Sequence, residues 1–151
     1  MEVIIMRGIP GSGKSTWANN SKNRSQNQLE VAVVSADNHF MVDGVYKFDP
    51  SKLRDAHNGC LKLFLFLLKS GDVKKLIVDN TNLTAAEIAP YYRIAEIYDA
   101  DVRIVTVHCD FREAVARGTH GVPISKMWQM HQTLLSERLP PYWKEDAVII
   151  Y

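Results

Sequence analysis

Short apolar runs alternate along the chain with longer segments in which apolar residues recur at helical spacing. The runs occupy residues 3–6, 31–34, 76–78, 102–107 and 147–151, and each has the length of one buried strand. Helices are predicted from Lys14 onward and over residues 51–69, 84–98, 111–117 and 123–138. Residues 36–50 hold Asp, Asn, Gly and Pro among aromatics, which predicts a loop.

This alternation indicates the fold class. Strands that are apolar throughout are covered on both faces, and strands that alternate with helices run parallel. The chain is therefore predicted to be an α/β protein, a three-layer sandwich with right-handed crossovers, in one domain over residues 1–151. Ligands of such sheets bind beyond the carboxyl ends of the strands, and most of the polar motifs below directly follow strand ends.

Composition limits the kinds of partner and location that are expected for this protein. The chain has 151 residues, is 46% hydrophobic and carries a formal net charge of +1, which does not mark a strongly basic nucleic-acid coat. Its two cysteines, Cys60 and Cys109, are far apart, so buried apolar roles and a reducing cytoplasm are expected. The N-terminus does not fit a signal peptide, and the apolar run 61–68 is too short to span a membrane.

Residues 8–15, GIPGSGKS, fit the phosphate-binding pattern G-x-x-x-x-G-K-[ST] between a predicted strand and a predicted helix. Lys14 is expected to reach the β- and γ-phosphates, and the Ser15 hydroxyl is expected to ligate Mg²⁺. The nucleotide contacts are expected from Gly11, Ser12, Gly13, Lys14, Ser15 and Thr16. The sequence holds no guanine-reading N-K-x-D, so a switch GTPase is excluded, and ATP with Mg²⁺ is expected, although no motif selects ATP over GTP.

Two aspartates follow the next two predicted strands. Asp37, in SADNHF, can face the γ-phosphate and deprotonate an acceptor hydroxyl, or it can be a turn aspartate. Asp79, in LIVDNTNL, stands where a carboxylate holds Mg²⁺, and the alternative is an N-terminal cap cluster for the helix that follows.

A candidate lid, residues 111–122, follows the fourth strand. Arg112 and Arg117 flank its short helix, and Gly118 and Gly121 allow the segment to bend. A mobile arginine closing over phosphates would neutralise charge in the transition state, and the alternative is a solvated surface arginine. The glycines favour Arg117 over Arg112.

Taken in order, GIPGSGKSTW, SADNHF, GVYKFDP, DNTNL and RGTHGVPI resemble the P-loop polynucleotide kinase-like family, over residues 2–134. The resemblance implies strand order 2-3-1-4-5 and transfer of the ATP γ-phosphate to a 5′-hydroxyl of RNA or DNA. It also implies Asp37 as general base, Lys14 and Ser15 at the donor site, and Arg117 as a lid arginine.

The resemblance does not extend to the acceptor side. Phage-type members carry an arginine three residues after the base, where this chain has Phe40. His39, Phe40 and His57 are candidate acceptor contacts, but the aromatics of the loop can equally pack into its own core, and a lone histidine such as His57 or His120 is more often structural. A small-molecule or nucleoside kinase and a non-catalytic ATP-binding module remain alternatives. The acceptor, the RNA or DNA preference and the oligomeric state are not determined by the sequence.

Overall fold

The structure, a computed structural model, describes residues 1–118 and 121–150. Its main sheet has five parallel strands in the order β2-β5-β1-β6-β7. Their bounds are β1 Glu2–Arg7, β2 Val31–Val34, β5 Lys75–Val78, β6 Asp101–Cys109 and β7 Glu145–Ile150. The helices are α1 Lys14–Asn23, α2 Leu53–Ser70, α3 Ala85–Ile97, α4 Phe111–Arg117 and α5 Ile124–Ser136.

All five predicted strands and the predicted strand order are therefore confirmed. The four helices with predicted bounds are also present, each within three residues of those bounds. The start of α3 follows the capping-box pattern in the sequence: the Thr84 hydroxyl accepts from Glu87 N at 3.3 Å, and the Glu87 carboxylate accepts from Leu83 N at 3.2 Å.

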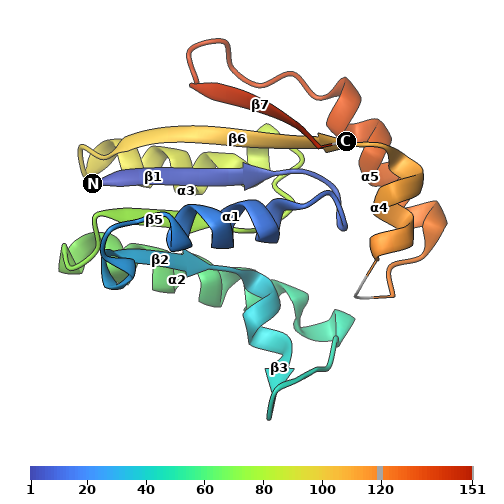
Figure 1. Ribbon diagram of the computed structural model, residues 1–151, viewed down its shortest axis with the longest axis horizontal. Helices are drawn as coiled ribbons and strands as arrows, with labels where there is room; N and C mark the ends of the chain where they lie inside the picture. The colour runs from blue at the N-terminus through green and yellow to red at the C-terminus, as the bar shows by residue number, and fades with distance from the viewer. Residues whose placement is uncertain (119–120, 151) are drawn as a thin grey trace.

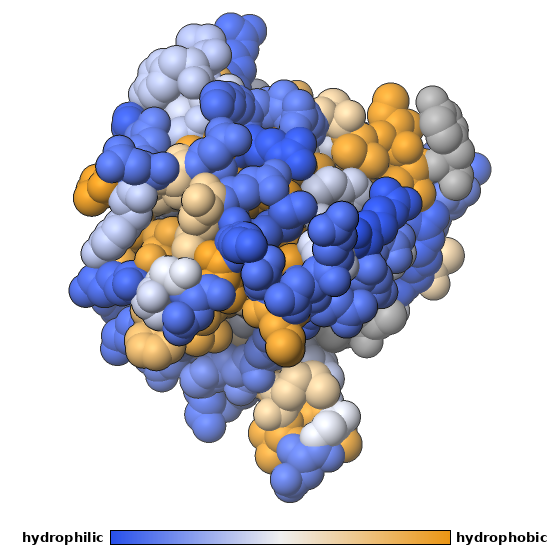
Figure 2. Space-filling model, turned by 60° about the vertical axis from the view of Figure 1, so that its left-hand side comes forward, coloured by the Kyte–Doolittle hydropathy of each residue, from blue (hydrophilic) through white to orange (hydrophobic). Residues whose placement is uncertain are grey.

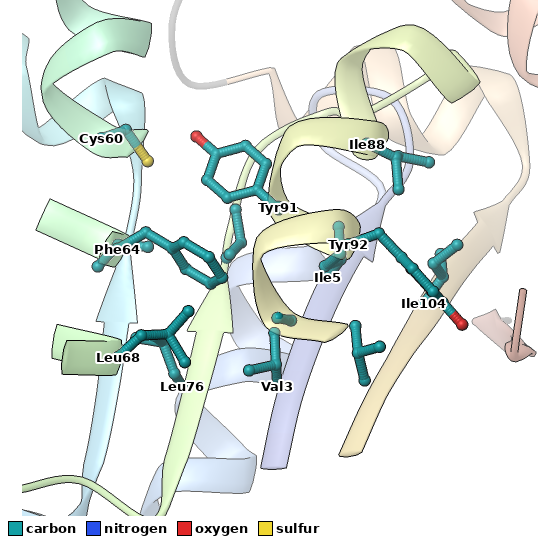
Figure 3. Close-up of a cluster of buried hydrophobic side chains, with 14 of the residues drawn as sticks. Val3, Ile5, Cys60, Phe64, Leu68, Leu76, Ile88, Tyr91, Tyr92 and Ile104 are labelled. Atoms are coloured by element: carbon teal, nitrogen blue, oxygen red, sulfur yellow. The ribbon is translucent and has the colours of Figure 1, made fainter. Parts of the chain in front are cut away.

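Three layers result from alternation along the central strand β1. Ile4 and Met6 belong to the cluster beneath α1 on one face, whereas Val3 and Ile5 pack with α2 and α3 on the other (Figure 1). All four side chains are fully buried, which is worth about 1.5–3 kcal/mol for each large apolar side chain. In the larger cluster Phe64 of α2 meets Tyr91 of α3 edge to face, with ring centroids 5.0 Å apart (Figure 3).

The loop prediction for residues 36–50 is wrong in part. The segment begins with a 3₁₀ turn, Ala36–Phe40, and continues into a small antiparallel hairpin, β3 Met41–Val42 and β4 Val45–Tyr46. Asp43 and Gly44 form its turn, with φ angles of +51° and +78°, as Asp-Gly does in two-residue hairpins. The hairpin projects from the carboxyl edge of the sheet at the foot of the molecule (Figures 1 and 2).

At the carboxyl edge of β1 and β6, α4 and α5 pack over a third apolar cluster that includes Ile9, Ala114 and Met127 (Figure 1). Both cysteines are free thiols; Cys60 is buried as expected, but Cys109 is only partly buried. None of the helices within residues 1–118 and 121–150 combines the length and the apolar character needed to cross a bilayer.

Candidate active site

The loop between β1 and α1 folds into the cradle that the sequence predicts. Ser12 N donates to Ile9 O at 3.2 Å, and the Lys14 ammonium reaches back across the loop to the same carbonyl at 2.8 Å. Gly11 and Gly13 have φ angles of +77° and +103°, which only glycine adopts freely. A Cβ on Gly11 would collide with the backbone carbonyl of Ala114 in α4, so the cradle also needs glycine for close packing.

The side chain of Lys14, including its ammonium group, is buried. Burial lowers the pKa of this ammonium to about 8, and the neighbouring carboxylates of Asp79 and Asp37 act in the opposite direction. A lysine held in this way retains strong attraction for phosphate oxygens, because few water molecules screen it. Thr16, in contrast, is exposed on the first turn of α1.

The start of α1 and the end of β5 bring Ser15 and Asp79 together. The Ser15 hydroxyl donates to Asp79 Oδ2 at 2.7 Å across 64 residues of sequence. Burial raises the pKa of Asp79, and the hydrogen bond from Ser15 and the charge of Lys14 oppose that rise. Asp79 does not cap the next helix; that position belongs to Thr84.

This pair fits Mg²⁺. A serine hydroxyl and a carboxylate are hard oxygen ligands, and Mg²⁺ in phosphate-transferring proteins takes one or two such ligands, completing its shell with water and phosphate oxygens. Among the described residues, no three or more His, Cys, Asp or Glu side chains are grouped so that they could hold a metal ion. Ser15 and Asp79 are the residues that could hold Mg²⁺ at this edge of the sheet.

Asp37 occupies the edge next to this pair, one strand away. The turn that carries it is capped by Ser35, whose hydroxyl accepts from Asp37 N at 3.2 Å, so the Asp37 carboxylate is not the cap. Its Oδ1 instead accepts a long hydrogen bond, 3.4 Å, from the hydroxyl of Tyr46 in the hairpin. Burial raises the pKa of Tyr46 to about 12, and the charge of Asp37 adds to this rise, so Tyr46 remains a donor at neutral pH.

A buried asparagine holds the Asp37 turn in place. Asn80 Oδ1 accepts from Ala36 N at 2.9 Å, and its amide nitrogen lies 3.5 Å from Cys60 Sγ. In the sequence, Asn80 is the polar residue that follows Asp79 in LIVDNTNL. Its position immediately after Asp79 at a strand end was the available signal, but its partner 44 residues away in sequence was not.

The lid arginine that the sequence favoured also reaches the cradle. Arg117 donates to Gly11 O at 3.3 Å and to the Glu113 carboxylate at 2.8 Å, one turn away on α4. Arg112 is exposed at the start of that helix. The bend proposed for the lid includes Thr119 and His120, which lie outside the described residues.

The three candidate acceptor residues fall in different environments. Phe40 is 3% exposed and belongs to the main core, where Tyr46 and Phe48 contact its ring with centroids 6.1 and 5.1 Å away. Its burial favours the packing interpretation. His39 and His57 are both exposed, and the His39 ring lies beside Gly59 of α2.

Arg7 is a buried residue that sequence reasoning missed. It ends β1, donates to Leu83 O at 2.9 Å and to Leu134 O at 3.4 Å, and lies 3.7 Å from the Glu145 carboxylate. Burial lowers its pKa, with Glu145 opposing. The available signal in the sequence was a charged residue at the end of a central apolar strand, because such a residue needs partners inside the protein. The partners of Arg7 lie in the loop after β5, in α5 and in β7, so Arg7 connects these three segments.

Proteins of known sequence and structure resemble this chain. Human NEDD4-binding protein 2 is 30% identical over 136 residues, which are 85% of this chain but only 7% of that protein. Among solved structures, a chain of the Pnkp1/Rnl/Hen1 RNA repair complex superimposes with a TM-score of 0.70 at 20% identity, covering 89% of this chain and 44% of that one. The APS kinase CysC of Mycobacterium tuberculosis gives 0.64 at 14% identity, covering 98% and 87%.

The structural likenesses establish the fold, that of small P-loop kinases. The chain spans less than half of the first of these structures and a small part of the human relative, so their activities are not transferred with the fold. The model of one family, described as an AAA domain, matches residues 3–120. That match includes the cradle, both aspartates and the lid helix, and the chain belongs to this AAA domain family.

Proposed function

We propose that this protein is an ATP-dependent phosphotransferase that moves the γ-phosphate to a 5′-hydroxyl of RNA or DNA. One observation carries the proposal: the turn with Asp37 follows β2, and the end of β2 is joined to the end of β5 where Asp79 N donates to Val34 O at 2.8 Å. Asp37 therefore lies at the same edge of the sheet as Lys14 and Asp79, and its charge acts to raise the pKa of both. A nucleotide-binding module needs no such base beside its phosphate site, whereas a kinase does.

In the proposed reaction, the acceptor hydroxyl gives its proton to Asp37 as its oxygen bonds to the γ-phosphorus. The bond between the γ-phosphorus and the oxygen that bridges to the β-phosphate breaks, and ADP leaves. Lys14 and Arg117 neutralise the charge that spreads over the phosphoryl oxygens. Mg²⁺, when held by Ser15 and Asp79, supplies further charge neutralisation at the phosphates.

The choice of acceptor is supported by the resemblance over the five motifs and by the likeness to a chain of an RNA repair complex. A small-molecule kinase is the second candidate. The burial of Phe40, where phage-type relatives carry an acceptor-holding arginine, favours that alternative. A panel of 5′-hydroxyl oligonucleotides, nucleosides and sugars separates the two.

The test of the base is Asp37→Asn, assayed by transfer of label from γ-labelled ATP to a 5′-hydroxyl oligonucleotide. We expect a loss of at least about 100-fold in kcat, the usual contribution of a general base. Asp72→Asn is the matched control, because Asp72 is exposed and precedes β5, at the opposite edge of the sheet. Transfer by Asp37→Asn at the wild-type rate would remove Asp37 from the reaction.

A further inference from the structure

The hairpin β3–β4 brings a tyrosine hydroxyl to the candidate base. Met41 pairs with Tyr46 across the hairpin, and Lys47 N donates to Phe40 O at 2.8 Å, so the chain returns to the turn that it has just left. There the Tyr46 hydroxyl donates to Asp37 Oδ1 at 3.4 Å. The hairpin thus supplies the base with a hydrogen-bond donor from the segment that directly follows it.

Two other aromatic rings contact the ring of Tyr46. It stacks with Phe48, at a centroid distance of 6.5 Å and an interplanar angle of 8°, and it meets Phe40 edge to face at 6.1 Å. Both arrangements are typical of favourable aromatic pairs. Phe40 belongs to the main core, so the position of the Tyr46 hydroxyl depends on core packing as well as on the short strands of the hairpin.

The groups around Asp37 come from three different elements. The charge of Asp37 acts to raise the pKa of Lys14 in α1 and of Asp79 after β5, and the hydroxyl of Tyr46 approaches from the hairpin. Burial raises the pKa of Tyr46 to about 12, so Tyr46 keeps its proton at neutral pH. It therefore donates to the carboxylate and does not compete with it as a base.

Resting on the function proposed above, we propose that Tyr46 is a positioning residue, whose hydroxyl holds Asp37 Oδ1 and directs Oδ2 toward the acceptor hydroxyl. A carboxylate turns about the bond to its side chain, and a catalytic base is commonly held by a third group that prevents such turning. The proton still passes from the acceptor oxygen to Asp37, and Tyr46 neither gains nor loses one. The segment GVYKFDP, residues 44–50, then takes part in the reaction by returning a hydroxyl to the base that SADNHF supplies.

The test is Tyr46→Phe, which removes the hydroxyl and keeps the ring, assayed with the full chain by transfer of label from γ-labelled ATP to a 5′-hydroxyl oligonucleotide. We expect kcat to fall about tenfold, because misplacement of a reacting group by about 1 Å costs up to about 100-fold. The KM for ATP should change less than about twofold, since the cradle is untouched. A thermal melt checks that the variant is folded at the assay temperature.

A second readout separates positioning of the base from a merely structural role. If Tyr46 acts through Asp37, Tyr46→Phe should cause no further loss of kcat in the Asp37→Asn background, because the base that it orients is already absent. A structural role would lower kcat by the same factor in both backgrounds. Tyr142→Phe is the matched control, with wild-type kcat expected, because the Tyr142 hydroxyl accepts from Arg93 of α3 at 3.1 Å and not from a residue of the site.

Three results would overturn the positioning role. The first is a wild-type kcat in Tyr46→Phe, and the second is an equal loss in the wild-type and Asp37→Asn backgrounds. The third is label that appears on the wild-type protein itself and disappears in Tyr46→Phe, because Tyr46 would then be a phosphate acceptor.

Hydrolysis of ATP without an added acceptor, measured in the same variants, distinguishes this proposal from the choice of acceptor, because water then gives its proton to the same base. Hydrolysis that depends on Asp37 and Tyr46, without transfer to oligonucleotides, would refute the polynucleotide acceptor and keep the positioning role. Transfer that Asp37→Asn abolishes and Tyr46→Phe leaves unchanged would refute the positioning role and keep the kinase. Absence of both reactions in the wild type would refute both proposals.

Discussion

Asn80→Ala tests whether one buried amide positions the candidate base. The substitution leaves the buried Ala36 N–H, which Asn80 Oδ1 accepts at 2.9 Å, without a partner. An unsatisfied buried donor costs about 2 kcal/mol, and the space left by the lost side-chain atoms adds about 1 kcal/mol. We expect the free energy of unfolding to fall by about 3 kcal/mol and Tm by about 9 °C, measured by urea and thermal melts.

The functional consequence is separable from stability. Asp37 follows Ala36 directly, so loss of the Asn80 bond frees the turn that carries the base. We expect kcat for label transfer to fall at least about tenfold at a temperature where the variant is folded, since misplacement of a reacting group by about 1 Å costs up to about 100-fold.

Leu68→Ala is the matched control, because Leu68 belongs to the core cluster that also contains Ala36 but lies near the C-terminal end of α2 (Figure 3). It is 6% exposed, and its truncation costs about 3 kcal/mol without touching the Asp37 turn. Equal activity losses in the two variants would refute positioning by Asn80. Unchanged stability of Asn80→Ala would refute the hydrogen-bond reasoning itself.

Three further predictions concern the cradle, the lid and the hairpin. Gly11→Ala should destabilise by at least about 2 kcal/mol more than Gly71→Ala in thermal melts, because the φ angles are similar, +77° and +70°, but only at Gly11 would a Cβ strike α4; equal losses would contradict this. Arg117→Ala should change the free energy of unfolding by less than about 0.5 kcal/mol yet lower kcat about 100-fold, and wild-type transfer would exclude the lid role. Burial raises the pKa of Tyr46 to about 12, against about 10 in the unfolded chain, so its contribution to stability is present below pH 10 and is lost as the pH rises toward 12. In urea melts, the difference in free energy of unfolding between wild type and Tyr46→Phe should shrink between about pH 10 and about pH 12. A difference that stays constant over this range would contradict the prediction.

The donor half of the candidate site was predictable because it is local in sequence. Gly11, Gly13, Lys14 and Ser15 are adjacent, and a strand before them with a helix after them fixes where their backbone groups point. The pairing of Ser15 with Asp79 was predictable from the sheet topology, since parallel strands present their carboxyl ends at one edge of the sheet.

The acceptor half was not predictable in this way. Phe40, Tyr46 and Phe48 are close in sequence, but which ring enters the core depends on the packing of α2 and the turn of a two-residue hairpin. The Asp-Gly turn was a signal for that hairpin, yet strands of two residues carry too little alternation to be recognised.

The sequence by itself determined the order and type of the main elements, the parallel sheet and the place of the glycine-rich loop between β1 and α1, because apolar periodicity and glycine placement act within a few residues. The tertiary structure alone decided what the chain does with its isolated polar groups. Asn80 and Arg7 are buried, so each needs hydrogen-bond partners, and those partners lie 20 to 127 residues away. Phe40 likewise packs in the core cluster, and its carbonyl accepts from Lys47 N at 2.8 Å, which holds the hairpin against the turn that carries Asp37.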